Sequence, residues 1–342
     1  MATHETEITE AVDLCTPDGR RLNRSAVGWS RVPLHRANLS GWGRTKRWDY
    51  WGILLGDGAV SLTFADLDFA GLVGLYWADF ASGDHIQVAP IVPLGRGIDL
   101  PDVPGSTTLR HHSRRFDALV HDVDGGTRLF AHWRGGDGRE LRLDAVAALP
   151  EGHESLSVVV PWTDTRFQYT SKHQARPVTG TLMIDGVTHP IGDERPAWAT
   201  LDVGRGRWPY QVTWNWAGGA GTSTDGHTVG IQLGSKWTDG TGSTENGMIV
   251  DGRLTKIGEE LAWDYAIDRP MDPWRVRSAH GDLDLTLTPR WDLPSNTNLG
   301  VLANTGHQVF GSWSGTIPRD DGDPLTLSDD VIGFAEEISW RW

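Results

Sequence analysis

The most informative segment of the chain reads Asp202-Val-Gly-Arg-Gly-Arg-Trp-Pro-Tyr-Gln-Val-Thr-Trp-Asn-Trp216. From Trp208 onward the large residues fall at every second position, which is the pattern of a β-strand. One face of this predicted strand carries Trp208, Tyr210, Val212, Trp214 and Trp216. Such a face either fills a core or walls a ligand cavity. An acid such as Asp202 beside an apolar cavity can serve as a proton donor.

The composition favours a protein built of sheets. The 342 residues include 18 Trp and 42 Gly, and turn-forming Pro, Asp and Gly occur throughout. No segment shows the 3.6-residue apolar pattern of a long helix. Many short apolar or alternating runs at a spacing of about ten residues are typical of barrels or sandwiches. We therefore predict an all-β fold.

Charge and cysteine content exclude several classes of protein. The formal net charge is -14 and no run of Lys or Arg offsets it, so phosphate backbones would be repelled and we expect no nucleic-acid partner. Cys15 is the only cysteine, which excludes an intrachain disulfide. No apolar run approaches the roughly 20 residues of a membrane span, and the start of the chain lacks an apolar signal core. We expect a cytoplasmic protein without a transmembrane segment and leave its oligomeric state open.

Two hairpins are the clearest local predictions. Asp185-Gly186 separates the apolar runs Thr179–Ile184 and Val187–Ile191, and Asp251-Gly252 separates a second pair of runs. Asp-Gly suits the two positive φ angles of a type I′ turn.

The length of the chain predicts two domains, because one hydrophobic core stops growing below this size. We predict a polar lead-in at residues 1–24, a first barrel at residues 25–162 and a second barrel at residues 163–342. The boundary is placed near the segment Pro161–Thr165. Eleven of the 18 tryptophans follow it, so the second barrel is expected to hold the more aromatic cavity.

A series of motifs follows in order along the second half: Tyr169-Thr-Ser171, Gly180-Thr-Leu182, Trp198-Ala-Thr-Leu-Asp202, Trp214-Asn-Trp216, Ile231-Gln-Leu233, Asp251-Gly252, and Trp274 with Leu285-Thr-Leu-Thr-Pro289. This order resembles the calycin enzymes with two lipocalin-like barrels, a group that includes carotenoid 1,2-hydratase, the AttH-like proteins and some fungal Diels-Alderases. The resemblance implies two lipocalin-like antiparallel β-barrels in tandem. The full chain, from Gly28-Trp-Ser30 to Gly333-Phe-Ala-Glu336, more closely resembles a bacterial family of domains of unknown function.

One departure limits what the resemblance implies about chemistry. In the hydratase-like relatives a Trp-x-Asp motif continues into a polar cluster and an aromatic residue. Here Trp198 and Asp202 are further apart, and Val203-Gly-Arg-Gly-Arg207 follows. The resemblance therefore transfers the fold better than the reaction.

Asp202 and His173 are the candidate catalytic residues. A proton donor in an apolar cavity needs a carboxyl group whose pKa is raised by desolvation, and Asp202 shares a predicted strand face with Trp198. The alternative is a turn aspartate that caps the following Gly-rich segment. His173 could orient the acid, or it could be a structural histidine. Strand alternation places Lys172 and His173 on opposite faces, so both cannot face one cavity.

The predicted substrate-binding residues come from the aromatic strand and from a polar loop. Lys236 lies inside Gly234-Ser-Lys-Trp-Thr-Asp-Gly240, close to Glu245 and Asn246, and the polar loop from Trp237 to Asn246 is a candidate for the rim of the cavity. A buried lysine could bind a carboxylate substrate or form a Schiff base, and an ion pair with Asp239 or Glu245 is the alternative. The full predicted set is Trp198, Trp208, Tyr210, Trp214, Trp237, Lys236 and Glu245.

Cofactor motifs are missing from the sequence. No His-x-x-x-His spacing indicates a metal, and no Gly-x-Ser-x-Gly elbow or Gly-x-x-x-x-Gly-Lys loop occurs. Gly204-Arg-Gly206 follows a predicted strand, but no helix follows it. We predict neither a metal nor a nucleotide cofactor.

Three functions remain open at this point. The first is a cofactor-independent hydratase, isomerase or cyclase that protonates a hydrophobic small molecule inside an aromatic-lined cavity. The second is a non-catalytic carrier of a lipid or terpenoid, which needs the cavity but not the acid. The third is a carbohydrate-active or carbohydrate-binding protein, which would need Trp platforms and, for cleavage, two facing carboxylates.

Overall fold

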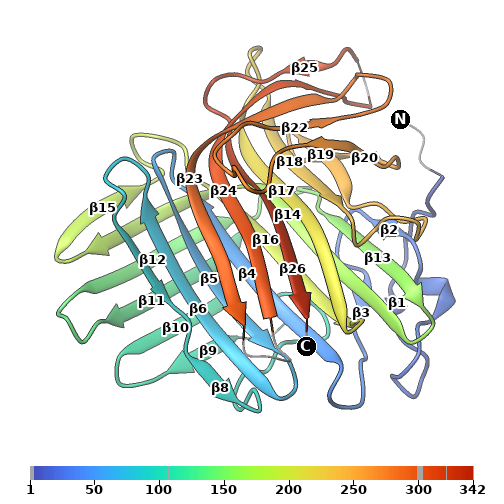
Figure 1. Ribbon diagram of the computed structural model, residues 1–342, viewed down its shortest axis with the longest axis horizontal. Coiled ribbons are helices and arrows are strands. Elements are labelled where there is room, and N and C mark those ends of the chain that lie inside the picture. The colour runs from blue at the N-terminus through green and yellow to red at the C-terminus, as the bar shows by residue number, and fades with distance from the viewer. Residues whose placement is uncertain (1–3, 107, 299–302, 321, 342) are drawn as a thin grey trace.

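The computed structural model describes residues 4–106, 108–298, 303–320 and 322–341, and strands dominate it (Figure 1). Within these residues the one helical element is a single 3-10 turn, η1 (Arg24–Ala26). Two short strands near the N-terminus, β1 (Val12–Asp13) and β3 (His35–Arg36), pair in parallel. The other strands form two large curled antiparallel sheets. The predicted all-β fold is confirmed.

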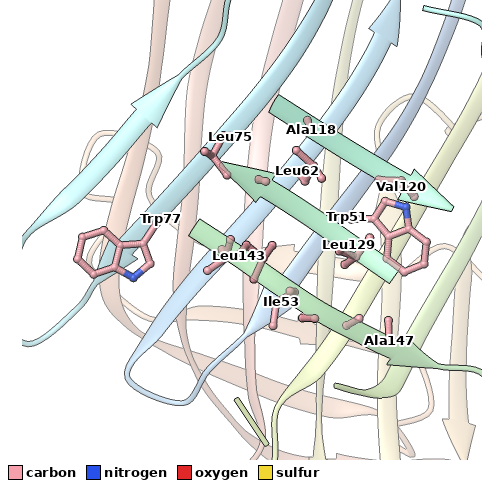
Figure 2. Packing of buried hydrophobic residues seen from close by; sticks show 14 of the residues in the cluster. Trp51, Ile53, Leu62, Leu75, Trp77, Ala118, Val120, Leu129, Leu143 and Ala147 are labelled. Atoms are coloured by element: carbon pink, nitrogen blue, oxygen red, sulfur yellow. The ribbon is translucent and has the colours of Figure 1, made fainter. Parts of the chain in front are cut away.

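The first sheet contains 14 strands and curls around an aliphatic core. Alternate residues of its strands face inward, and Figure 2 shows Leu62 and Leu75 from one side of the sheet meeting Leu129 and Leu143 from the other. Its strands are β2 (Trp29–Ser30), β4 (Thr45–Leu54), β5 (Gly58–Asp66), β6 (Ala70–Asp79), β7 (His85–Val88), β8 (Ile91–Pro93), β9 (Leu109–His112), β10 (Phe116–Val123), β11 (Gly126–Arg134), β12 (Glu140–Ala148), β13 (Leu156–Thr163), β14 (Arg166–Ile184), β15 (Val187–Ile191) and β16 (Trp198–Arg207).

The second sheet contains ten strands and has a core of its own. Buried residues such as Ile231, Leu285 and Trp313 fill this core. Its strands are β17 (Gln211–Thr222), β18 (Thr228–Ser235), β19 (Asn246–Val250), β20 (Arg253–Ile257), β21 (Ala262–Asp264), β22 (Trp274–Arg277), β23 (Asp284–Asn298), β24 (Ala303–Ile317), β25 (Leu325–Thr326) and β26 (Ile332–Arg341).

Both predicted Asp-Gly hairpins are confirmed. β14 pairs with β15 across Asp185-Gly186, and β19 pairs with β20 across Asp251-Gly252. The φ angles are 51° and 86° in the first turn and 47° and 80° in the second. Positive φ at both central positions is the requirement of a type I′ turn, which explains the choice of Asp and Gly.

β14 is longer than the sequence pattern predicts. It extends the predicted run Thr179–Ile184 backward through Phe167–His173, whose residues also alternate, into one strand of 19 residues. Its first part pairs with β13 and β16, and its second part pairs with β12 and β15. The register against β16 shifts between His173 and Arg176, where Ala175 has a φ of 56°. This irregularity bends one strand around the first core while it stays paired.

The strand pairing bears on where the chain divides. Residue 162, the expected domain boundary, lies inside β13, and β13 and β14 both belong to the first sheet. The chain passes from the first sheet to the second between Arg207 at the end of β16 and Gln211 at the start of β17. Sheet membership therefore changes three strands after residue 162, because β14, β15 and β16 still belong to the first sheet.

The two sheets pack directly against each other. In Figure 1 the strands β23, β24 and β26 cross in front of β4 and β16. Apolar contacts link Leu54 and Tyr76 of the first sheet with Trp216, Phe310 and Phe334 of the second. Because strand side chains alternate, β14 and β16 face the first core on one side and the second sheet on the other. The residues on that second side form the interface described next.

No helix among the described residues is long and apolar enough to cross a membrane.

Candidate functional site

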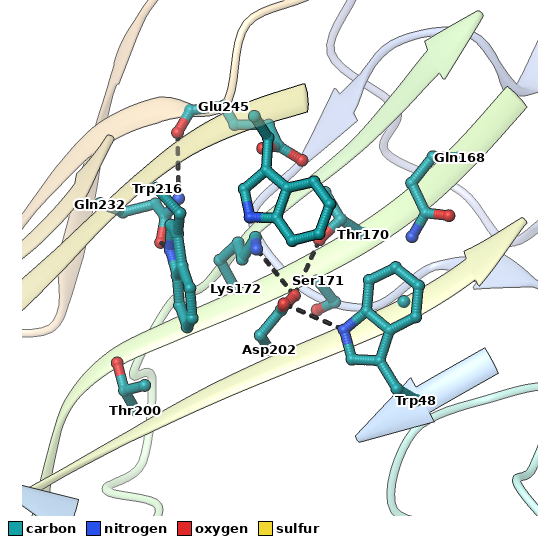
Figure 3. A network of polar contacts seen from close by, with 12 residues as sticks. Trp48, Gln168, Thr170, Ser171, Lys172, Thr200, Asp202, Trp216, Gln232 and Glu245 are labelled. Atoms are coloured by element: carbon teal, nitrogen blue, oxygen red, sulfur yellow. Dashed lines mark hydrogen bonds and ion pairs between the residues drawn. The ribbon is translucent and has the colours of Figure 1, made fainter. Parts of the chain in front are cut away.

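Asp202 and Lys172 form a buried ion pair at the interface between the sheets (Figure 3). The two residues are direct cross-strand partners of β16 and β14. Lys172 Nζ lies 2.8 Å from Asp202 Oδ1, and the side chains are 3% and 9% exposed. Asp202 lies in the middle of β16 and does not cap a turn, so the turn-aspartate alternative does not describe its position.

Two further donors complete the surroundings of Asp202. Thr170 Oγ1 donates a hydrogen bond of 3.1 Å to Oδ1, and Trp48 Nε1 donates one of 3.0 Å to Oδ2 (Figure 3). Trp48 reaches the carboxylate because its ring lies flat on Gly204, where a Cβ atom would stand 2.1 Å from the indole. Asp202 thus accepts from three donors, on Lys172, Thr170 and Trp48, an arrangement that stabilises negative charge on its carboxylate.

Two more buried carboxyl groups, those of Glu245 and Glu336, lie on the side of the interface that the second sheet forms. Glu245 Oε2 accepts a hydrogen bond of 2.8 Å from Trp237 Nε1, while its Oε1 is buried and has no partner in the described part of the chain. Glu336 Oε1 accepts one of 2.7 Å from Trp214 Nε1. Burial raises the pKa of each carboxyl group to about 7, and the charge of Lys172 opposes this rise in both. Asp202 adds to the rise through like-charge repulsion. Both groups can therefore carry a proton near neutral pH.

The tryptophans around these acids pack as one cluster. Trp208 is its hub, because its ring centroid lies 5.2 to 6.2 Å from four other tryptophan rings. Each of these four contacts has an edge-to-face geometry, which aromatic pairs favour. The four neighbours are Trp48, Trp162, Trp214 and Trp237. Trp208 also donates a hydrogen bond of 2.6 Å to Gln168 Oε1, so the hub is fixed in orientation.

Lys172 also contacts the aromatic wall. Its Nζ lies 4.3 Å from the ring centroid of Trp216 and 6.0 Å from that of Trp237. Trp216 Nε1 donates to Gln232 Oε1, and Gln174 Nε2 of the first sheet donates to the same oxygen, both at 3.0 Å. The faces of these tryptophans therefore already stabilise one cation in the site.

His173 faces away from this cluster. Its Nε2 lies 3.1 Å from Ser171 Oγ, which accepts a hydrogen bond from Ser157. Burial, with the charges of Arg176 and His153, lowers the pKa of His173 to about 3. Because side chains alternate along β14, His173 points to the face opposite Lys172 and Asp202. Lys172, and not His173, is therefore the partner of Asp202.

The structure brings together some of the predicted binding residues and not others. Trp208, Trp214, Trp237 and Glu245 lie at the interface with Asp202. Trp208 and Tyr210 precede β17 rather than belonging to it, because the strand begins only after Pro209. Tyr210 is 48% exposed and lies outside the tryptophan cluster, so the single regular strand face predicted for these residues is wrong.

Two other predicted residues lie elsewhere. Lys236 is partly exposed, and its Nζ lies 2.6 Å from Glu337 Oε2, so its ion-pair partner is neither Asp239 nor Glu245. Trp198 is at the opposite end of β16 from the tryptophan cluster. It lines a separate open pocket of about 170 Å³ with His153, Asp251 and neighbouring residues.

Sequence reasoning missed Glu336 and set Lys172 aside. The signal for Glu336 is present in β26, where Phe334, Glu336 and Ile338 alternate on one face. An acid on an otherwise apolar strand face indicates a buried carboxyl group. No such signal identifies Lys172 as the partner of Asp202, because that contact depends on the pairing of β14 with β16.

No group of three or more His, Cys, Asp or Glu side chains in the described parts of the chain is arranged to hold a metal ion.

Comparison with known proteins identifies the family and the fold. A family model described as a domain of unknown function, DUF2804, matches residues 5–342. No curated protein matches the sequence. The crystal structure of a putative AttH from Nitrosomonas europaea is similar, with a TM-score of 0.52 at 13% identity, covering 97% of this chain and 98% of that one.

Two further solved structures are more distant. Kievitone hydratase from Nectria haematococca has a TM-score of 0.47 at 13% identity and covers 86% of this chain and 89% of its own. CghA with Sch210972 has a TM-score of 0.40 at 11% identity and covers 87% of this chain and 88% of its own. The likeness to the AttH structure, which spans nearly the whole chain, confirms the tandem-barrel fold implied by the sequence resemblance.

Proposed function

This chain belongs to the DUF2804 family, and we propose that it is a cofactor-independent enzyme that acts by acid catalysis on a hydrophobic small molecule. The reaction class is a hydration, an isomerisation or a cyclisation. One observation carries the proposal: two buried carboxyl groups with a pKa of about 7, Glu245 and Glu336, flank the ion pair of Lys172 and Asp202 among tryptophan rings.

Glu245 and Glu336 are the proposed proton donors. A general acid works best when its pKa lies near the operating pH, because it is then still protonated and still acidic. Glu245 Oε1 has no hydrogen-bond partner among the residues that the structure describes. Its carboxyl proton could therefore pass to a carbon–carbon double bond or a carbonyl oxygen of a bound substrate without breaking an existing contact.

Asp202 has a different proposed role in this arrangement. As an ionised carboxylate it would stabilise the positive charge that develops on the substrate after protonation. The faces of Trp216 and Trp237 would add to this, as they do for the ammonium group of Lys172. The cation then either loses a proton to a carboxylate, which completes an isomerisation or cyclisation, or takes up water and releases a proton. The role of Asp202 as the proton donor itself stays a prediction.

The test separates catalysis from binding. Native mass spectrometry of the purified protein would identify a co-purified apolar ligand, whose conversion is then followed by chromatography. We expect Glu245→Gln or Glu336→Gln to lower turnover by about 10² to 10⁴-fold while ligand affinity changes little. Asp202→Asn should lower turnover as well, since it removes the stabilising charge.

Glu337→Gln is the matched control, because Glu337 follows Glu336 directly but pairs with Lys236 outside the cluster. This variant should turn over at the rate of the unmodified protein. If the Glu245, Glu336 and Asp202 variants all keep that rate, acid catalysis in this cluster is disproved. Ligand binding without conversion by any variant would instead assign the protein to the carriers.

A further inference from the structure

Residues 4–8 of the N-terminal segment lie against β2 of the first sheet. The Trp29 backbone N–H donates to the Thr6 carbonyl at 2.9 Å, and the Ile8 N–H donates to the Trp29 carbonyl at 2.7 Å. Trp29 Nε1 also donates to the Glu5 carbonyl at 3.3 Å. These three hydrogen bonds fix the backbone that carries Glu5.

The side chain of Glu5 crosses to the second sheet. Its Oε1 lies 2.7 Å from Nζ of Lys256 on β20, and both side chains are only 2% exposed. The Thr244 hydroxyl lies 2.7 Å from the same oxygen, and the Thr244 backbone N–H donates to Oε2 at 3.2 Å. Thr244 directly precedes Glu245, a proposed proton donor. Glu5 therefore holds a buried cation and, at the same time, the backbone next to the acid.

Lys256 and Glu245 share one face of the hairpin that β19 and β20 form. Lys256 is the cross-strand partner of Gly247, and Glu245 stands two positions before Gly247, so alternation puts both side chains on the same side. This side faces the first sheet, because its next cross-strand pair, Ile249 with Leu254, packs with residues of β13. Diagonal neighbours of this kind are within reach of long side chains.

Lys256 thus has two carboxyl groups within reach and pairs with one of them. Both oxygens of Glu5 are engaged, whereas Glu245 Oε1 is buried and has no hydrogen-bond partner in the described chain. Burial raises the pKa of Glu245 to about 7, Lys172 of β14 and Lys256 oppose this rise, and Asp202 of β16 adds to it. Lys172 is already paired with Asp202. The pairing of Lys256 therefore decides how much positive charge Glu245 meets.

We propose that Glu5 is a positioning residue for Glu245: by pairing with Lys256 and holding Thr244, it keeps the ammonium group away from the acid. Without the Glu5 carboxylate, Lys256 pairs with Glu245, which then ionises and has no proton to donate. This inference rests on the proposed function, because it concerns the same acid. It makes the N-terminal segment of the first sheet a part of the candidate site.

The pKa of Glu245 in the ligand-free protein tests this role without any substrate. It is measured by NMR titration of the ¹³C-labelled side-chain carboxyl group, assigned with Glu245→Gln. Glu5→Gln keeps the shape of the side chain and removes its charge, so it should lower the pKa of Glu245 by about 1 to 3 pH units, as a newly paired cation does.

A second variant separates this role from a merely structural one. Glu5→Gln combined with Lys256→Met removes the cation as well, and it should return the pKa of Glu245 to about 7 or above. A segment that only held the fold together would leave Glu245 equally exposed to solvent in both variants. A pKa that stays low in the double variant would therefore overturn the proposal.

Glu7→Gln is the matched control, because Glu7 lies in the same segment but pairs with the partly exposed Arg31. It should leave the pKa of Glu245 unchanged. An unchanged pKa in Glu5→Gln would overturn the positioning role and leave acid catalysis by Glu245 standing. Failure of Glu5→Gln to fold would also overturn it, since Glu245 would not have replaced Glu5 as the partner of Lys256. A pKa near 4.5 in the unmodified protein would overturn both the positioning role and Glu245 as the proton donor.

Discussion

The interiors of the two sheets and the surface between them are built from different residues. The interiors are apolar and mainly aliphatic, with Leu129 and Leu143 in the first and Ile231 and Leu285 in the second. The interface buries a lysine, three carboxyl groups and a tryptophan cluster. Buried charge costs stability unless it is paired and hydrogen-bonded, which makes the buried titratable groups of the interface candidates for a functional role. In this tandem-barrel fold the candidate chemistry lies between the barrels rather than inside them.

The largest effect is expected from breaking the ion pair at the interface. Lys172→Met leaves the Asp202 carboxylate buried without its cation, which should lower the free energy of unfolding by about 3 to 5 kcal/mol. Urea denaturation at pH 7 measures this loss. Removing both charges in Lys172→Met with Asp202→Leu should restore much of the stability, since apolar replacements of a buried pair are often neutral.

Leu129→Ala is the comparison from the interior of the first sheet. It should also lower the free energy of unfolding, by about 2 to 5 kcal/mol, through the cavity it leaves. No change at Asp202 should restore that loss. If the double variant at the interface is no more stable than Lys172→Met alone, the interface is held by packing in the same way as the interiors, and the contrast between them fails.

A smaller effect concerns the pH dependence of stability. Burial raises the pKa of Glu336 from 4.5 to about 7, so the folded state holds this proton more tightly than the unfolded state. The stabilisation is fully present below pH 4.5 and is lost as the pH rises to about 7. Between pH 5 and 7.5 this loss amounts to about 2 kcal/mol.

The variant Glu336→Gln should remove that part of the pH dependence. Between pH 5 and 7.5 the free energy of unfolding of Glu336→Gln should decrease by about 2 kcal/mol less than that of the unmodified protein. The comparison between the two proteins cancels the opposing contribution of His173, whose lowered pKa makes stability rise with pH up to about 6.5. Parallel stability curves for the two proteins would show that Glu336 is ionised throughout this range.

The smallest effect is expected at Lys236, outside the interface. Its ion pair with Glu337 is partly exposed, with side chains 38% and 20% accessible. Exposed pairs contribute about 0 to 1 kcal/mol. Lys236→Gln should therefore change the urea midpoint little, and it should leave turnover of an identified substrate unchanged. A strong loss of turnover would extend the site beyond the interface to the loop that follows β18.

Local sequence signals predicted most of the fold. Period-two alternation identified the strands, and the Asp-Gly pairs identified two turns whose φ angles the structure confirms. Local patterns failed where pairing decides the outcome. The two runs that form β14 read as separate strands because the residues between them, including Ala175 and Pro177, interrupt the pattern. Only the partners on both sides hold that segment extended.

The candidate site was predictable in part for the same reason. Asp202, Glu245 and the tryptophans stand out by type and by their neighbours in the sequence. The sequence offers His173 as a candidate to orient Asp202, with a structural histidine as the alternative, whereas the cross-strand register supplies Lys172 as its partner. Glu336 lies 134 positions from Asp202 in the numbering and joins it only because the second sheet packs on the first. No periodicity within a short segment of sequence can predict a contact between residues so far apart in the chain.

The chain passes only once between its two large sheets, which bears on whether the protein can be divided into two fragments. All described strands up to β16 belong to the first sheet or the small N-terminal pair, and all from β17 onward belong to the second. A break at Pro209 would leave each polypeptide with a complete set of strands. Two separately expressed fragments, residues 1–209 and 210–342, would then meet at the tryptophan cluster and at the apolar contacts between the sheets.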